Sequence, residues 1–313
     1  MNNQQLLPLT LIDRLNQFFT LPKQGDFLPR WMNLRLLNNK KQANRSDALR
    51  QGQVYLIGAG PGDAELLTLK AHRLIQQADV VMYDWLVNPD ILNMIPVNTD
   101  RVFVGKKCGQ HSMQQADICQ LMIDVAKQGK NIVRLKGGDP AIFARVGEEC
   151  DILAKHHINF AIVPGITAAS GASAYAGIPL THRDCAQSVR FITAHLKSED
   201  EQPDWASFVP KVGCKTTETL VFYMGLRRLP SIMQNLVKHG LSENMPVAVI
   251  DQASSRQQKV CIGKVLNIAQ GIENMDFKGP AVIIVGEVVS KRCEVDLELL
   301  DKSYTSKKIG AYA

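Results

Sequence analysis

Between residues 53 and 166, short apolar runs alternate with stretches in which apolar residues recur every three or four positions. The short runs predict buried strands, and the periodic stretches predict helices with one buried face. Strands that alternate with helices are typical of α/β layers around a largely parallel sheet. The expected strands are Val54–Ile57, Val80–Tyr83, Val102–Val104, Ile132–Leu135 and Phe160–Val163.

The second half of the chain has a more mixed pattern. Ala168–Gly177 is a run of small residues, which suits either a closely packed helix or a linker between two halves. Two apolar runs separated by polar residues, Val247–Ile250 and Lys259–Ile262, are compatible with a hairpin. Further strands are expected at Phe191–Ala194, Leu220–Tyr223 and Ala281–Val285. We therefore expect an α/β protein with two α/β domains.

The predicted domains cover residues 53–166 and 167–292, with an N-terminal extension at 1–52 and a C-terminal tail at 293–313. The extension is rich in Asn and Gln, but Leu11, Leu15, Phe18 and Phe19 recur at helical spacing. Two interpretations remain open for this segment. It forms a short helix that docks on the body or stays loose, or it binds a partner or a membrane surface.

Composition and charge narrow the classes of function. The chain has a net charge of +6, but residues 53–290 carry 23 basic and 23 acidic side chains, so the excess lies in the two flanking segments. This distribution argues against a basic face that binds nucleic acid. No apolar stretch approaches the roughly 20 residues that span a bilayer, and the N-terminus lacks the apolar block of a signal peptide. We expect a cytoplasmic protein with neither a nucleic-acid nor a membrane partner.

Cysteine and histidine spacing gives no sign of a metal site. None of the seven cysteines forms a C-x-x-C pair, which favours free thiols in a reducing compartment. His156 and His157 are adjacent, and on a helix their side chains would point about 100° apart. We expect no bound metal.

A glycine turn follows the first expected strand directly. Gly58, Gly60 and Gly62 allow the backbone to turn tightly and to approach a ligand, because no Cβ intervenes. The spacing G-x-G-x-G is not the dinucleotide fingerprint, and Pro61 removes an N–H that a pyrophosphate would use. By itself this segment is either a ligand-binding turn or a structural one.

Similar turns follow two other expected strands. Gly137 and Gly138 come after Ile132–Leu135, and residues 163–168 form a turn after the strand that ends at Val163. Asp139 is expected to cap the following helix, with Pro140 at its first position. Because parallel strands end at the same edge of a sheet, the turns are expected to share one ligand site.

Together these motifs resemble the tetrapyrrole methylase family, and within it the members that methylate uroporphyrinogen III. They occur in family order and cover residues 53–290. The matching segments are Gly58–Asp63, Tyr83–Val87, Val104–Lys107, Leu135–Pro140, Val163–Thr167, Ala176–Arg183, Tyr223–Gly225 and Val285–Val288.

The resemblance implies a homodimer of two-domain subunits that hold S-adenosylmethionine in a cleft between the domains. It also implies two methyl transfers, to C2 and C7 of uroporphyrinogen III, that give precorrin-2 for sirohaem, cobalamin or haem d1 synthesis. The cofactor-binding residues carried over from the family are Pro61, Gly137, Gly138, Asp139, Ile142, Thr167, Ala168, Met224 and Ala253.

The resemblance also assigns catalytic roles. Asp84 stands where the family places its proton acceptor, and Lys106 where it places its proton donor. The competing interpretation of Asp84 is a cap on the next helix. A substrate with eight carboxylates needs cationic partners, and the candidates are Arg183, Arg145 and Lys107, although a lone arginine such as Arg183 can also be a solvated surface residue.

Two alternatives to this function remain. One is another enzyme of the same fold, such as a later corrin-ring methylase or a diphthine synthase. The other is a catalytically silent ligand-binding protein, against which the presence of both Asp84 and Lys106 argues. Residues 1–52 do not resemble the NAD-binding dehydrogenase–chelatase part of fused sirohaem synthases. We therefore expect neither oxidation nor iron insertion here.

Overall fold

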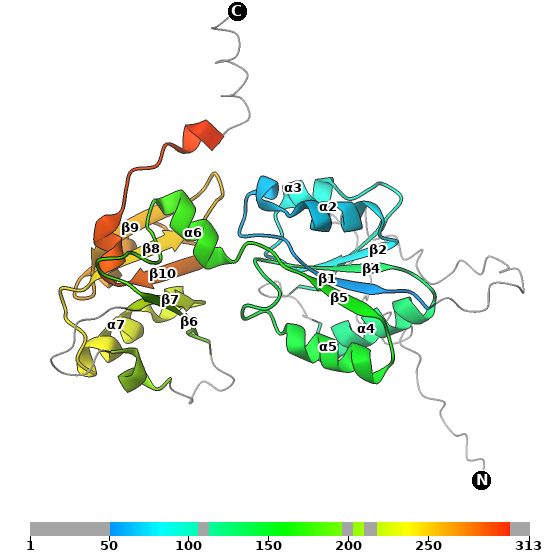
Figure 1. The fold of residues 1–313 in the computed structure, drawn as a ribbon, viewed down its shortest axis with the longest axis horizontal. Coiled ribbons are helices and arrows are strands. Elements are labelled where there is room, and N and C mark those ends of the chain that lie inside the picture. The colour runs from blue at the N-terminus through cyan, green and yellow to red at the C-terminus, as the bar shows by residue number, and fades with distance from the viewer. Residues whose placement is uncertain (1–50, 106–112, 196–202, 210–217, 301–313) are drawn as a thin grey trace, which may run out of the picture.

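The chain forms two α/β units, each built on its own five-stranded sheet, and they lie side by side in Figure 1. This architecture is seen in a computed structural model that describes residues 51–105, 113–195, 203–209 and 218–300. The expected α/β class with two α/β domains is confirmed. The domain limits at residues 52, 166 and 292 stay predictions.

The first sheet is entirely parallel, with the strand order β3-β2-β4-β1-β5. Its strands coincide with or overlap the five apolar runs of the first half of the sequence. Their bounds are β1 Val54–Gly58, β2 Val80–Tyr83, β3 Asp100–Phe103, β4 Ile132–Lys136 and β5 Phe160–Val163.

Helices cover both faces of this sheet, as a parallel sheet requires. Figure 1 shows α2 and α3 on one face and α4 and α5 on the other. Alternate residues of each strand face opposite layers, so Ile57 packs with α2 and α3 while Leu56 packs with α4 and α5. Thr68 caps α2 by accepting a hydrogen bond from the Ala71 N–H. The helices are α2 Leu69–Gln76, α3 Pro89–Asn93, α4 Gln115–Lys127 and α5 Val146–Lys155.

The second sheet is mixed, with the strand order β6-β7-β10-β8-β9. Only β6 and β7 pair in parallel, and the other three pairs are antiparallel. The pair β8 and β9 confirms the hairpin expected from the sequence. The strands are β6 Ser188–Thr193, β7 Glu218–Tyr223, β8 Pro246–Asp251, β9 Lys259–Lys264 and β10 Ala281–Val285.

The run of small residues forms a helix, α6 (Ala168–Ala176), and not a linker. Ala169, Ala172 and Ala176 are buried against one face of the second sheet, where only small side chains allow so close an approach. The helix ends at Gly177, whose φ of 67° is left-handed. The other face of the sheet carries α7 (Leu229–Lys238) and α8 (Ile268–Glu273).

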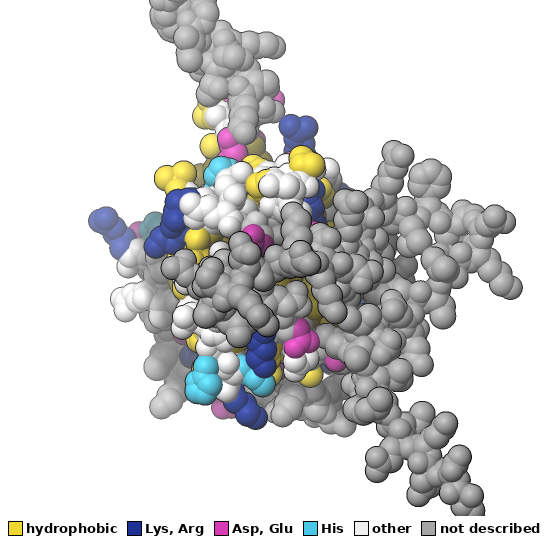
Figure 2. Space-filling view, turned by 90° about the vertical axis from the view of Figure 1, so that its right-hand side faces the viewer, with side chains coloured by type: hydrophobic (Ala, Val, Ile, Leu, Met, Phe, Trp, Pro, Cys, Tyr) yellow, Lys and Arg dark blue, Asp and Glu magenta, His cyan; other side chains and the backbone are white. Residues whose placement is uncertain are grey.

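Several sequence-based expectations concern segments outside the described residues. The expected helix with Leu11 and Phe18 lies there, as do Cys108 and Cys214. The five described cysteines are free thiols. In the described part of the chain, no helix has the length and apolarity to span a bilayer. On the face drawn in Figure 2, the described Lys and Arg side chains lie in several separate places and do not form one continuous patch.

Candidate functional site

Three glycine-containing turns meet at the carboxyl edge of the first sheet. They follow β4, β1 and β5, which are neighbours in the sheet and run in parallel. The Gly60 N–H donates to the Gly138 oxygen at 3.1 Å, and the Gly138 N–H donates to the Gly60 oxygen at 2.8 Å. The expectation that the turns share one edge is therefore confirmed.

The turns approach so closely that side chains would not fit between them. A Cβ on Gly58 would lie 2.6 Å from the Gly165 Cα, and a Cβ on Gly165 would lie 2.3 Å from the Gly138 oxygen. Gly138 also has a left-handed φ of +69°, which L-residues rarely adopt. Close backbone packing thus requires glycine at positions 58 and 165, and the left-handed backbone favours glycine at position 138.

Asp139 joins two of these turns, and the expected helix cap is wrong. Its Oδ1 accepts from the Ala141 N–H at 2.7 Å, and its Oδ2 accepts from the Gly165 N–H at 3.0 Å. The next helix, α5, begins only at Val146, because Phe143 and Arg145 have left-handed backbone angles that a helix cannot include. Asp139 therefore stabilises the site and not the start of a helix.

The first glycine turn also contacts the second unit. A Cβ on Gly171 in α6 would lie 2.4 Å from the Pro61 Cγ, so the ring packs directly on the helix backbone. The Asp63 N–H donates to the Ser254 Oγ at 3.2 Å, and the Tyr175 hydroxyl donates to the Asp63 Oδ2 at 2.6 Å. Burial, and then the hydrogen bond to Asp63, raise the pKa of Tyr175 well above its ordinary value.

Residues from the second unit complete this junction. Met224 follows β7, and Ala253 comes just after β8; both strands are antiparallel to β10 between them, so they end at the same edge. Ile142 and Ala168 pack against the same apolar cluster as Ala253. Thr167 and Tyr223 share a 2.6 Å hydrogen bond between their hydroxyls. The structure thus places all nine expected cofactor residues around the junction.

Asp84 lies at the same edge of the first sheet, directly after β2. Its Oδ1 accepts from the Leu86 N–H at 3.1 Å, and its Oδ2 lies 3.5 Å from Nη2 of Arg134. The next helix, α3, begins at Pro89 with Asn88 as its cap, so Asp84 does not cap it. The carboxylate is partly exposed, at 24% of its side chain, and can reach a ligand.

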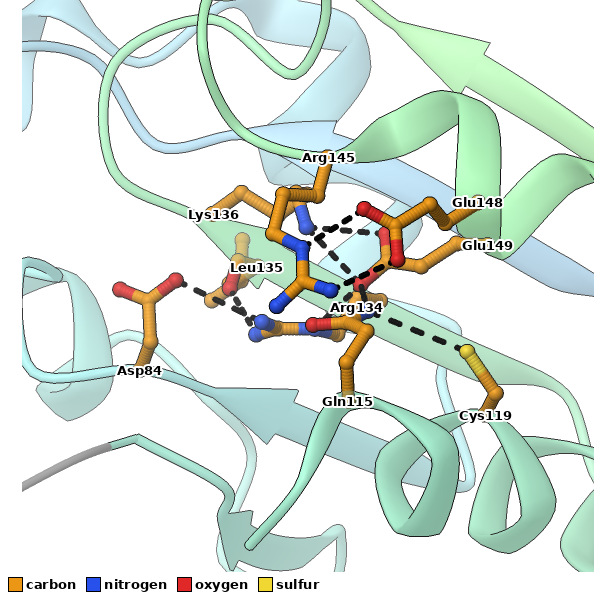
Figure 3. Close-up of polar contacts among 9 residues, drawn as sticks. All are labelled: Asp84, Gln115, Cys119, Arg134, Leu135, Lys136, Arg145, Glu148 and Glu149. Atoms are coloured by element: carbon orange, nitrogen blue, oxygen red, sulfur yellow. Dashed lines mark hydrogen bonds and ion pairs between the residues drawn. The ribbon is translucent and has the colours of Figure 1, made fainter. Parts of the chain in front are cut away.

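Behind Asp84 lies a group of charged residues that the sequence pattern did not single out (Figure 3). Arg134, Lys136 and Glu149 are all buried, and the Lys136 Nζ contacts both oxygens of Glu149 at 2.9 Å. The sequence did carry one sign of this group. Arg134 and Lys136 are two cationic residues, two positions apart, at the end of a run that predicts a buried strand.

The candidate substrate-binding cations differ in their surroundings. Arg145 forms a bidentate pair with Glu148, with two N–O distances of 2.7 Å, and that hydrogen bonding raises the pKa of Arg145. Arg183 is exposed and makes no hydrogen bond or ion pair with the described residues. Lys106 and Lys107 lie outside the described residues, so their positions stay predictions.

A surface cavity of about 590 Å³ is lined by the end of α6, residues 177–182 and residues 291–293, none of which is an expected site residue. In the ranges that the structure describes, no group of three or more His, Cys, Asp or Glu side chains could hold a metal ion.

Comparison with known proteins decides the family. Residues 53–269 match the family model of the tetrapyrrole (corrin/porphyrin) methylases. The chain belongs to this family. Tetrapyrrole methylases of known structure share its architecture, among them the uroporphyrin III C-methyl transferase of Thermus thermophilus. That protein is 36% identical, with a TM-score of 0.64, and the match covers 77% of this chain and 94% of that one.

The chain is also similar to other proteins over most of its length. The Thermus thermophilus enzyme complexed with S-adenosyl homocysteine is 37% identical with a TM-score of 0.65, over 77% of this chain and all of that one. The siroheme synthase of Pseudoalteromonas translucida is 49% identical over 245 residues, or 78% of this chain and 51% of that protein. The siroheme synthase of Pseudomonas aeruginosa is 52% identical over 241 residues, or 77% and 51%. The chain therefore spans about half the length of these curated relatives.

Proposed function

We propose that this tetrapyrrole methylase is an S-adenosylmethionine-dependent C-methyltransferase that methylates uroporphyrinogen III at C2 and C7 to give precorrin-2. The observation that carries the proposal is the convergence of three bare-backbone turns with Met224 and Ala253, beside the partly exposed Asp84. The similarity to uroporphyrin III C-methyl transferases over almost their whole length favours this substrate.

The junction fits the proposed methyl donor. A Cβ added to Gly138 would have only the Ala168 nitrogen within 4 Å, at 3.7 Å, so this turn leaves room for a ligand against its backbone. Met224 has a left-handed φ of 56° and a half-exposed side chain, and Ala253 is small and buried. We propose that these residues bind S-adenosylmethionine together with Pro61, Gly137, Asp139, Ile142 and Thr167.

The proposed reaction requires the protein chiefly to position the methyl donor and the substrate relative to each other. The bound cofactor supplies a methyl group on a sulfonium cation, a good electrophile that needs no enzyme nucleophile. The chain's turns would hold this donor in line with an electron-rich pyrrole carbon, and such orientation supplies much of the barrier lowering. A C–C bond forms as the S–CH₃ bond breaks, sulfur keeps the electron pair, and the ring system becomes cationic. Asp84 would accept the proton that the ring then loses.

The proposed partners of the substrate carboxylates give one prediction. Arg183→Ala should raise the KM for uroporphyrinogen III by about 10- to 150-fold, because one charge-assisted hydrogen bond is worth roughly 1.5–3 kcal/mol. The affinity for S-adenosylhomocysteine, measured by calorimetry, should stay unchanged. Arg73→Ala, on the exposed side of α2, is the matched control. Equal losses in the binding of both molecules would contradict the role given to Arg183.

The proposed reaction is tested with the purified chain under anaerobic conditions. The protein is incubated with S-adenosylmethionine and enzymatically prepared uroporphyrinogen III, and the absorbance of methylated products is followed. We expect two methyl groups per tetrapyrrole, counted with a labelled donor and by mass spectrometry. Binding of the donor without any methyl transfer to uroporphyrinogen III would refute the proposed substrate.

We also propose a homodimer. Light scattering of the protein as it elutes from a size-exclusion column should then give twice the mass of the chain.

A further inference from the structure

Two cationic side chains occupy the most buried strand position of the first sheet. Arg134 and Lys136 lie on β4, between β1 and β2, and are 4% and 3% exposed. They share a face of the strand with Ile132, which packs under α4 and α5. Buried charges are costly unless they are paired, so the groups that face these two cations must balance them.

Their partners are two carboxylates from different elements. Glu149, on α5, is fully buried and takes both Lys136 contacts at 2.9 Å. Its Oε1 also accepts from the Gln115 Nε2 at 3.1 Å, at the first turn of α4. Asp84 is the second anion, so the group holds two positive and two negative charges (Figure 3). Burial and then the neighbouring Arg134 lower the pKa of Lys136, and Glu149 opposes both effects.

Arg134 spans the distance between the two carboxylates. Its Nη2 lies 3.5 Å from the Asp84 Oδ2, and its Nε lies 3.5 Å from the Glu149 Oε1. Its Nη1 donates to the Leu135 oxygen at 2.7 Å, whereas Nε has no hydrogen-bond partner in the described part of the chain. The ion pair with Glu149 is therefore what holds the inner side of the guanidinium. Because Lys136 and Gln115 both contact the Glu149 carboxylate, its position is fixed, and it can in turn fix the position of Arg134.

We propose that Glu149 is a positioning residue for the methyl transfer, which holds Arg134 so that its outer nitrogen faces and orients the Asp84 carboxylate. This inference rests on the proposed function, in which Asp84 accepts the proton. Glu149 itself is fully buried and would not touch the substrate. Its effect on the reaction would pass through Arg134 to Asp84.

A double-mutant cycle tests this chain of contacts. The rate constant kcat is measured on uroporphyrinogen III for the wild type, Glu149→Gln, Asp84→Asn and the double variant, all expressed per S-adenosylhomocysteine-binding site counted by calorimetry. Glu149→Gln should lower kcat roughly 10- to 100-fold, the cost of a misplaced group, with KM unchanged. In the Asp84→Asn background the same change should lower kcat less than twofold, since its target is gone.

The outcomes separate this inference from the proposed function. A wild type that does not methylate uroporphyrinogen III refutes the function, whereas an active wild type with multiplicative losses in the cycle refutes the role of Glu149. Glu149→Gln with full kcat also refutes it. Lys136→Met combined with Glu149→Gln removes the unpaired buried cation and should raise the melting temperature above that of Glu149→Gln. A recovery of kcat in that variant would show that Glu149 only stabilises the fold. Asp151→Asn, exposed on the same helix, is the matched control.

Discussion

Replacing Asp84 with Asn is expected to slow methyl transfer by about 10²- to 10⁴-fold, the usual contribution of a positioned proton acceptor. The amide keeps the size of the carboxylate and an oxygen that can accept from the Leu86 N–H, so the turn after β2 should be preserved. What it removes is the negative charge and the basic oxygen. The measurement is the initial rate of labelled methyl transfer from S-adenosylmethionine to uroporphyrinogen III.

Binding measurements separate this effect from misfolding. The affinity for S-adenosylhomocysteine should match the wild type, because Asp84 is not among the residues proposed to hold the cofactor. Asp90→Asn is the control, since Asp90 is exposed on α3 and lies in the same part of the chain. A variant that keeps the wild-type rate would show that Asp84 only shapes the turn after β2.

The second large effect is expected from Gly165→Ala. The new Cβ would lie 2.3 Å from the Gly138 oxygen and 2.8 Å from the Gly58 Cα, and both are backbone atoms that cannot rotate away. We expect a loss of about 3 kcal/mol in the free energy of unfolding, the upper end of the usual cost of overpacking. Denaturant unfolding measures this loss. Cofactor binding should weaken as well, because the turn at Gly138 must shift.

Gly147→Ala provides the matched control for this prediction. A Cβ at Gly147 has nothing within 4 Å, and the residue lies in the first turn of α5, where Ala is favoured over Gly by up to about 1 kcal/mol. This variant should be as stable as the wild type or slightly more so. If Gly165→Ala proved equally harmless, the three turns would not depend on backbone contact.

Much of the fold was predictable because local patterns report burial directly. The five apolar runs of the first half are strands with a parallel register, and four of them are buried or partly buried, whereas the edge strand β5 exposes its first three residues. The glycine turn that ends β1 lies at the carboxyl edge of the sheet, as expected. Topology explains why this prediction worked. Once strands alternate with helices, parallel pairing places all their carboxyl ends together.

The expectation that was wrong, and the charged group that was not expected, both depend on contacts between residues far apart in the sequence. Asp139 has the spacing of a helix cap, yet it binds the Gly165 N–H, 26 residues away, and α5 starts later. Arg134 lies within the expected apolar strand and Lys136 directly follows it, and their charges are balanced by Glu149 and Asp84 from other elements. Lys136 and Glu149 are 13 positions apart, and Arg134 and Asp84 are 50 positions apart. Ion pairs over such separations leave no local pattern in the sequence.

The order of strands and helices and the glycine turns were determined by the sequence alone, because each depends on local spacing. Motifs in the sequence also led to the proposal of Asp84 and the cofactor-binding residues, which stays a proposal. The tertiary structure decided which turns touch, how Tyr175 and Ser254 tie the first turn to the second unit, and how Arg134 comes to face Asp84. These contacts join residues that are far apart in the sequence and that meet only when the chain folds. Their energies depend on distances and burial, which exist only once the two sheets have formed and packed.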